Sequence, residues 1–215
     1  MSNRGTSLLI RLESVVPKGL VEVFSGAAGE QFVSAIQEDL LDMVSTWCRV
    51  GREREVVVLL DHPNEAALHR AARRGLMVEA GFLQSAQLIG RVRKALSAHR
   101  VVAVLDQPSP DFALADVDRL IRKAHEGLAV AADLDGGWTA FALDTTVQGV
   151  IADEGEIGAL VERARLKDVV IHALTPTGRI DSEEELKALG FRIEHKRARA
   201  PRTRRLLIEM GVLSP

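Results

Sequence analysis

Carboxylates, glycines and an aromatic ring lie close together in residues 128–143, LAVAADLDGGWTAFAL. Asp135 comes after an apolar run, and Gly136, Gly137 and Trp138 follow it directly. Adjacent glycines permit positive φ and a close approach of the backbone to a ligand, and the indole ring could form one wall of a pocket. The same residues also suit a tight β-hairpin, because Asp-Gly and Gly-Gly are common two-residue turn signals. Taken alone, the segment favours the hairpin, with a ligand site as the alternative.

Two of the expected strands end in an aspartate that is followed closely by proline. Asp106 follows VVAVL and precedes Pro108, and Asp61 follows EVVVLL. Ligands of open α/β sheets gather outside the carboxyl ends of strands, where a carboxylate could hold the Mg²⁺ or Mn²⁺ of a bound nucleotide diphosphate. The alternative is an aspartate that bonds amides of its own loop. We favour this alternative for Asp61 and the metal site for Asp106.

Short runs rich in Val, Leu, Ile and Ala alternate with helical patterns along the chain, as in strands covered on both faces. Strands are predicted at residues 7–12, 55–60, 101–105, 128–132, 139–143 and 168–174. Helices are predicted at residues 30–47, 64–74, 86–98, 115–125 and 154–165. A further helix starts at Ser182 with a capping box and is expected to end at Gly190. The alternation predicts an α/β fold, a three-layer αβα sandwich with a mostly parallel mixed sheet, in which the hairpin supplies an antiparallel strand.

Composition argues against several classes of protein. The 215 residues are 47% hydrophobic, which is enough for the core of one domain. The formal net charge of −2 gives no general attraction to nucleic acid or to anionic membranes. No apolar run approaches the roughly 18 residues of a membrane span. With a single cysteine, Cys48, no disulfide can form within the chain. We expect a soluble, cytoplasmic protein for which nucleic acid is not a partner.

The C-terminal segment differs from the rest, and it is predicted to form a basic extension, residues 195–215, after a domain of residues 1–194. It begins with HKRARAPRTRR and ends with the apolar LLIEMGVLSP. We favour a solvated face or tail for the basic run over a site for nucleic acid or phosphate-rich ligands. The apolar end is expected to dock on the domain or on a second subunit, so a homodimer is one possible assembly.

An ordered set of motifs between residues 7 and 189 carries a family resemblance. Asp106 and Pro108 are followed by a helix and then by Asp-Gly-Gly-Trp. GFLQSAQLIGRVRKAL, which contains Gln84, stands before this pair, and IDSEEELKAL, which contains Asp181, stands after it. In this order the motifs resemble those of bacterial glycosyltransferase-like proteins of the nucleotide-diphospho-sugar transferase (GT-A) fold, whose distant relatives include the molybdenum-cofactor and phospholactate guanylyltransferases.

The resemblance implies a transferase that uses a nucleotide or nucleotide-sugar donor and an unknown acceptor, assisted by Mg²⁺ or Mn²⁺ at Asp106. SLLIRLESVVPKG lies where the family has its first strand and nucleotide loop. The implied catalytic residues are Asp106 and Asp135. The implied nucleotide-binding residues are Pro17, Lys18, Gly19 and Gln84. The implied pocket residues are Pro108, Gly136, Gly137, Trp138 and Asp181.

One departure from the family pattern keeps a second function open. The family's nucleotide loop continues with Lys-Thr-Arg, whereas Pro17-Lys18-Gly19 is followed here by Leu-Val-Glu-Val. Lys18 is then the only nearby cation for donor phosphates, and preorganised cations are a main source of transition-state stabilisation. The alternative is therefore a catalytically degenerate member of the fold that acts as a binding or scaffold subunit.

Overall fold

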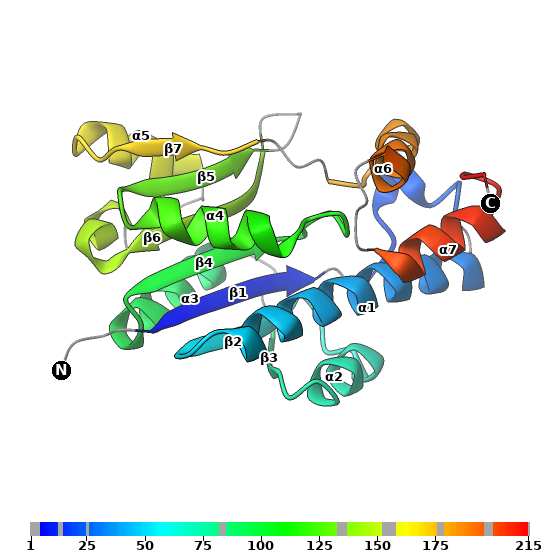
Figure 1. Cartoon of the computed structure of the whole chain (residues 1–215), viewed down its shortest axis with the longest axis horizontal. Coiled ribbons are helices and arrows are strands. Elements are labelled where there is room, and N and C mark those ends of the chain that lie inside the picture. The colour runs from blue at the N-terminus through cyan, green and yellow to red at the C-terminus, as the bar shows by residue number, and fades with distance from the viewer. Residues whose placement is uncertain are drawn as a thin grey trace.

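A computed structural model describes residues 5–12, 15–24, 26–81, 85–132, 137–151, 158–175, 179–195 and 200–214. Its centre is a seven-stranded mixed sheet in the order β3-β2-β1-β4-β6-β5-β7 (Figure 1). The strands are β1 (Thr6–Leu12), β2 (Arg54–Leu60), β3 (Met77–Ala80), β4 (Val101–Asp106), β5 (Leu128–Ala132), β6 (Trp138–Asp144) and β7 (Ile171–Ala173). β6 runs antiparallel to both of its neighbours, and the remaining four pairs of neighbouring strands are parallel. The predicted mixed sheet and its antiparallel hairpin strand are confirmed.

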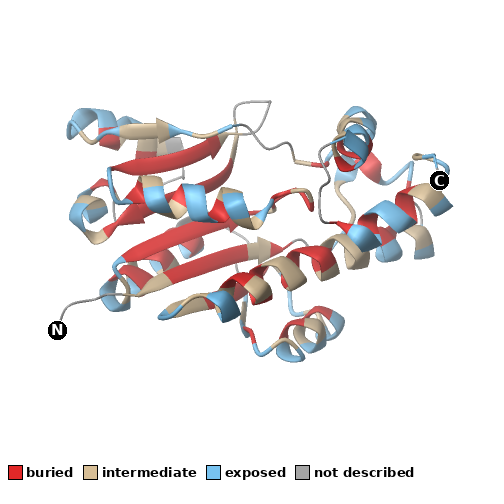
Figure 2. Cartoon of the chain, in the orientation of Figure 1, coloured by how far each residue is buried: buried red, intermediate tan, exposed pale blue. Residues whose placement is uncertain are grey.

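Helices cover both faces of the sheet, which gives the predicted three layers. The helices are α1 (Ala27–Val50), α2 (Glu65–Ala72), α3 (Ser85–Ala98), α4 (Leu114–Ala124), α5 (Gly158–Leu166), α6 (Glu183–His195) and α7 (Pro201–Glu209), with short 3₁₀ turns η1 (Lys18–Leu20) and η2 (Thr145–Val150). One apolar core joins the sheet to α1, α2 and α4, and a second joins the opposite face to α3, α5 and η2. The central strands are buried almost throughout (Figure 2) because both of their faces are covered.

A third apolar core lies beyond one end of the sheet. In this core, η1 and the first turns of α1 pack against α6 and α7. Its centre holds the stacked rings of Phe24 and Phe32, whose centroids are 4.1 Å apart. Figure 1 shows α1 running from the sheet to this end, so its first turns belong to the third core and its later turns to the first. The third core fixes η1 and α6 relative to the sheet.

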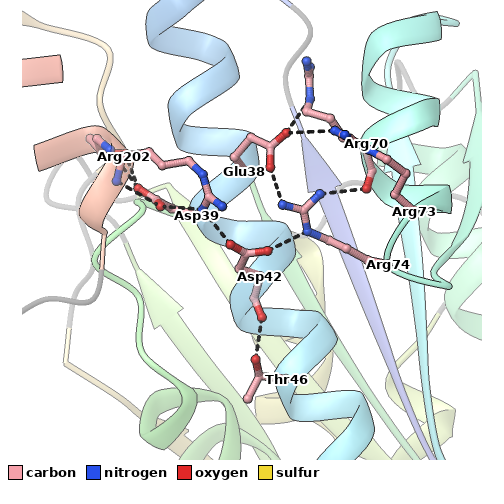
Figure 3. Close-up of polar contacts among 9 residues, drawn as sticks. Glu38, Asp39, Asp42, Thr46, Arg70, Arg73, Arg74 and Arg202 are labelled. Carbon is pink, nitrogen blue, oxygen red and sulfur yellow. Dashed lines mark hydrogen bonds and ion pairs between the residues drawn. The ribbon is translucent and has the colours of Figure 1, made fainter. Parts of the chain in front are cut away.

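Hydrogen bonds to a buried carboxylate fasten α7 to α1 (Figure 3). The side chain of Asp39 is fully buried and accepts hydrogen bonds of 2.8 Å from both the backbone N and Oγ1 of Thr203. Arg202 extends to Asp42 at 2.6 Å, and Asp42 also pairs with Arg74 of α2 at 2.7 Å. Arg202 of the basic C-terminal run is thus paired with two acidic residues of α1. The division of the chain near residue 195 stays a prediction.

The main differences from the sequence prediction concern β3, α6 and α7, and β7 is also shorter than the predicted strand at residues 168–174. β3 was not predicted, because MVEA is a short edge strand whose residues are exposed or only partly buried. α6 does not end at Gly190 but continues to His195, since Gly190 is buried and a Cβ there would come within 2.6 Å of Leu213. α7 was not predicted, because its residues were read as the end of the basic run and the start of the apolar end, although Pro201 occupies the first turn, where proline suits a helix. Across the described residues, no helix is long and apolar enough to cross a bilayer.

Candidate functional site

The candidate site lies at the carboxyl edge of the sheet, where β1 and β4 end side by side. Arg11 of β1 and Asp106 of β4 are register partners on these parallel strands. Arg11 Nε lies 2.6 Å from Asp106 Oδ1, and the side chains are only 14% and 8% exposed. The sheet therefore presents a buried arginine–carboxylate pair at the edge where ligands of α/β folds gather.

A second arginine reaches the same carboxylate from the segment before α6. Arg179 Nη2 lies 3.2 Å from Asp106 Oδ2 and donates a hydrogen bond of 3.1 Å to the carbonyl oxygen of Trp138. Burial raises the pKa of Asp106 above its ordinary value, and the charges of Arg11 and Arg179 act against that rise. Asp106 thus lies between two guanidinium groups.

Three polar atoms in this arrangement are buried without a hydrogen-bond partner among the described residues. They are Arg11 Nε, Asp106 Oδ1 and Arg179 Nε. Two of them, Arg11 Nε and Asp106 Oδ1, lie 2.6 Å apart and form an ion pair with each other. Buried polar groups in folded proteins almost always find a partner, so the third atom, Arg179 Nε, marks a place where a ligand or water would be favoured.

A cleft of about 320 Å³ opens beside Arg179. The lining residues come from η1, from the residue after β4 and from the segment that leads into α6. They are Pro17, Lys18, Gly19, Gln107, Arg179, Ile180 and Asp181. Four of them, Pro17, Lys18, Gly19 and Asp181, were predicted as site residues. The cleft brings them together although more than 160 residues separate η1 from Asp181 in the chain.

The backbone on both sides of the cleft is tightly constrained. Gly19 approaches the segment before α6 so closely that a Cβ on it would stand 1.9 Å from the carbonyl oxygen of Asp181. Gln107 has a φ of +51°, in the left-handed region that residues with a side chain rarely adopt. Its backbone N donates a hydrogen bond of 3.0 Å to the carbonyl oxygen of Arg11. Backbone strain of this kind is often found at functional sites.

The remaining predicted residues have mixed placements. Pro108 lines a small apolar cavity of about 60 Å³ that adjoins the cleft through Pro17, Gln107 and Ile180. The side chain of Trp138 packs against the core on the α3 face, and its carbonyl oxygen is the atom that contacts Arg179.

Other predicted residues stand between β5 and β6 in the sequence or precede α3. Gly137 directly precedes β6 at the same edge of the sheet as Asp106. Gln84, Asp135 and Gly136 lie outside the described residues. Their predicted roles stay predictions.

The described residues do not fit a divalent cation at Asp106. Both carboxylate oxygens already face a guanidinium nitrogen, at 2.6 and 3.2 Å, so a metal ion bound to either oxygen would lie against a like charge. Within the described ranges, no group of three or more His, Cys, Asp or Glu side chains is placed to hold a metal. The assignment of a metal to Asp106 therefore stays a prediction, and the observed geometry speaks against it.

Arg11 and Arg179 were missed by the sequence analysis, which counted Lys18 as the only cation. A signal for Arg11 exists, because it is the single charged residue in the apolar run SLLIRL. Aligning the ends of this run and of VVAVLD as neighbouring strands pairs Arg11 with Asp106. Arg179 offers no such signal, because it lies in a connection whose course depends on the third core.

Comparisons with known proteins identify the fold. No family model and no curated protein matches the chain. A presumed nucleotide-diphospho-sugar transferase from Desulfovibrio desulfuricans G20 has a similar structure, with a TM-score of 0.75 and 16% identity over 97% of this chain and 96% of that one. The 4-diphosphocytidyl-2C-methyl-D-erythritol synthase of Anaerococcus prevotii DSM 20548 has a TM-score of 0.59 and 14% identity over 90% and 100% of the two chains.

A protein of Mycobacterium tuberculosis H37Rv, solved in complex with manganese, has a TM-score of 0.56 and 14% identity over 87% of this chain and 98% of that one. The chain therefore has a nucleotide-diphospho-sugar transferase-like (GT-A-like) fold, as the ordered motifs predicted. Identities this low establish the fold, and the activity has to be argued from the cleft.

Proposed function

We propose that the chain is a transferase that binds a nucleotide or nucleotide-sugar donor in the cleft between Lys18 and Arg179, acting as a glycosyltransferase or a related nucleotidyltransferase. The observation that carries the proposal is the convergence of the predicted nucleotide turn with Asp181 around one cavity at the carboxyl edge of the sheet. The similar structures support it, because one is named as a nucleotide-diphospho-sugar transferase and another as the synthase of a diphosphocytidyl compound.

The charges of the cleft suit the phosphates of such a donor. Lys18 is exposed at the mouth, Arg179 lines the wall, and Arg11 lies behind Arg179 on Asp106. Among the described residues three cations face two carboxylates, those of Asp106 and Asp181, which gives this set a net positive charge that suits a diphosphate. Cations fixed in advance would orient the donor and stabilise the charge that develops on its leaving group.

The sequence also predicts assistance by Mg²⁺ or Mn²⁺, and the manganese complex of one similar structure is consistent with metal use in that protein. Because Asp106 is held by two arginines, the proposal needs no metal for donor binding. The same contact favours the second candidate function, a degenerate member of the fold that binds a nucleotide without transferring it. The cytoplasmic location, the acceptor and a homodimer stay predictions from the sequence.

Thermal unfolding with and without nucleotides tests the proposal. UDP-, GDP-, ADP- and CDP-sugars, CTP and GTP are added to the full chain, each with Mg²⁺, with Mn²⁺ and with EDTA. A ligand that binds the native state raises the unfolding midpoint by mass action. We expect one base to raise it in native protein and Lys18→Ala to reduce the rise.

Lys167→Ala is the matched control. Lys167 is also exposed, but it stands shortly before β7 and therefore at the amino edge of the sheet, opposite the carboxyl edge that holds the cleft. It should leave the ligand-induced rise unchanged. The proposal fails if no nucleotide at millimolar concentration moves the midpoint. Product formation from the nucleotide that binds, measured with candidate acceptors, then separates the transferase from the degenerate binder.

A further inference from the structure

We propose that Arg11 and Arg179, oriented by Asp106, form a metal-independent binding site for the phosphate groups of the donor. This inference rests on the proposed function, because it states how the cleft recognises a nucleotide. It gives Asp106 a different task from the predicted one: the carboxylate positions two arginines and holds no metal.

The charge balance of the buried cluster supports this assignment. The side chains of Arg11, Asp106 and Arg179 are 14%, 8% and 30% exposed. Two guanidinium groups share one carboxylate, so within the part of the chain that the structure describes one positive charge of this cluster has no paired carboxylate. Burying an uncompensated charge is unfavourable, and a phosphate in the adjoining cleft would supply the missing negative charge.

Hydrogen-bonding capacity is also left over. Nε of Arg179 is buried and has no hydrogen-bond partner among the described residues, whereas Nε of Arg11 lies 2.6 Å from Asp106 Oδ1. Guanidinium groups form planar forks that match phosphate oxygens in bidentate pairs. Phosphate oxygens could therefore use donor capacity that Asp106 alone does not satisfy.

The position of Arg179 connects the cluster to the cleft. It contacts Asp106 on one side and lines the cavity with Lys18 and Gln107 on the other. An anion that enters beside Lys18 would meet Arg179 before it could reach Asp106. A metal ion on Asp106 and the observed arginines would compete for the same two oxygens, so the two modes of phosphate binding exclude each other.

Isothermal titration calorimetry with pyrophosphate and with CTP tests the inference on the full chain, in EDTA and then in Mg²⁺ or Mn²⁺. We expect both anions to bind in EDTA, and we expect Arg179→Gln to weaken binding by roughly tenfold or more, as for the loss of a charge-assisted contact. Arg192→Gln is the matched control. Arg192 is also paired with an aspartate, Asp111, at 2.6 Å and is 20% exposed, but it is not among the residues that line the cleft.

Asp106→Asn gives opposite results under the two assignments. If Asp106 orients arginines, the asparagine oxygen can still accept hydrogen bonds from them while the negative charge that competes with phosphate is gone, so pyrophosphate binding in EDTA should be as strong or stronger. If Asp106 holds a metal, the variant should lose metal-dependent binding and show none in EDTA. Circular dichroism reports whether the variant folds, and Arg179→Gln decides the question if Asp106→Asn does not.

The outcomes separate this inference from the proposed function. Binding of CTP or a nucleotide-sugar only with Mg²⁺ or Mn²⁺ overturns the inference and leaves the proposed function standing. Binding of pyrophosphate in EDTA without binding of any nucleotide supports the arginine site and overturns the proposed function. Absence of binding by every anion, with and without metal, overturns both.

Discussion

Gly19 and Asp181 touch through their backbones, so closely that a Cβ on Gly19 would stand 1.9 Å from the carbonyl oxygen of Asp181. This contact joins the turn that carries Lys18 to the segment that carries Arg179, and both segments line the same cleft. The width of the cleft is therefore set by a position that accepts no side chain unless the backbone moves.

Gly19→Ala should both destabilise the protein and weaken nucleotide binding. Overpacking of this kind typically costs about 1 to 3 kcal/mol, and the displaced turn would carry Lys18 with it. Urea denaturation measures the first effect and nucleotide titration the second. Gly149→Ala is the control, because a Cβ on Gly149 would meet no atom within 4 Å and should change the free energy of unfolding by less than about 0.5 kcal/mol.

Gln107 should tolerate glycine better than any β-branched residue. A φ of +51° destabilises the fold by about 1 to 2 kcal/mol when the residue has a Cβ, and glycine adopts this φ without that strain. We expect Gln107→Gly to be at least as stable as the native chain in urea denaturation, and Gln107→Val to be less stable. Equal stabilities of the two variants would contradict the left-handed conformation at this residue.

Because of Asp144, the free energy of unfolding should depend on pH in the acidic range. Burial alone would raise the pKa of Asp144, but hydrogen bonds from the backbone N of Thr146 and from His125 and Arg100 hold it below its ordinary value. A lowered pKa in the folded state contributes stability above the unfolded-state pKa of about 3.9, and this stability is lost as the pH falls through the folded-state value.

Asp144→Asn measures that contribution. At pH 7 the variant should be less stable than the native chain by about 2 kcal/mol, the typical worth of hydrogen bonds to a charged group. The difference should shrink as the pH falls below about 4, where the native carboxylate is protonated as well. Thermal unfolding of both proteins between pH 3 and pH 7 makes the comparison. A difference that stays constant over this range would exclude the ionised form of Asp144 as its source.

Asp39→Asn should loosen the C-terminal helix. Asp39 is fully buried and accepts two hydrogen bonds of 2.8 Å from Thr203, so its loss should cost about 2 kcal/mol. Hydrogen exchange of residues 201–209 should quicken while exchange in β1 and β4 stays slow. Asp42→Asn is the comparison, because Asp42 is 47% exposed and its pairs should be worth less than about 1 kcal/mol. Slow exchange of α7 in Asp39→Asn would contradict this role.

The sequence was sufficient to predict the elements and their order because hydrophobic periodicity is a local property. The runs that became β1, β2, β4, β5 and β6 were each located to within one or two residues. The carboxyl-edge position of Asp106 followed directly, because it ends one of those runs. The helix start at Ser182 was correct as well, since Ser182 Oγ accepts a hydrogen bond of 3.2 Å from the backbone N of Glu185, while the Glu185 carboxylate accepts one of 2.9 Å from the backbone N of Asp181.

What the sequence could not show depends on how distant segments pack. Arg179 reaches Asp106 across 73 positions, and no periodic signal marks such a contact. Gly190 looked like the end of a helix because glycine is common there, but in the fold it is the place where Leu213 packs against α6. The described arginines of the basic run are exposed, as predicted, but the pairs that Arg202 makes with Asp39 and Asp42 were not foreseen, because these acids belong to a helix about 160 residues earlier.

The packing of α7 against α1 has a consequence for how the protein is made. The apolar side chains beneath the Lys18 turn, among them Leu20 and Phe24, share one core with Leu206 and Leu207. During synthesis the strands from β1 to β4 can pair long before residue 201 has been added. The Lys18 turn cannot complete its packing until then, so the nascent chain would hold a formed sheet with an unfinished cleft. Ligand binding should be among the last properties that the growing chain acquires.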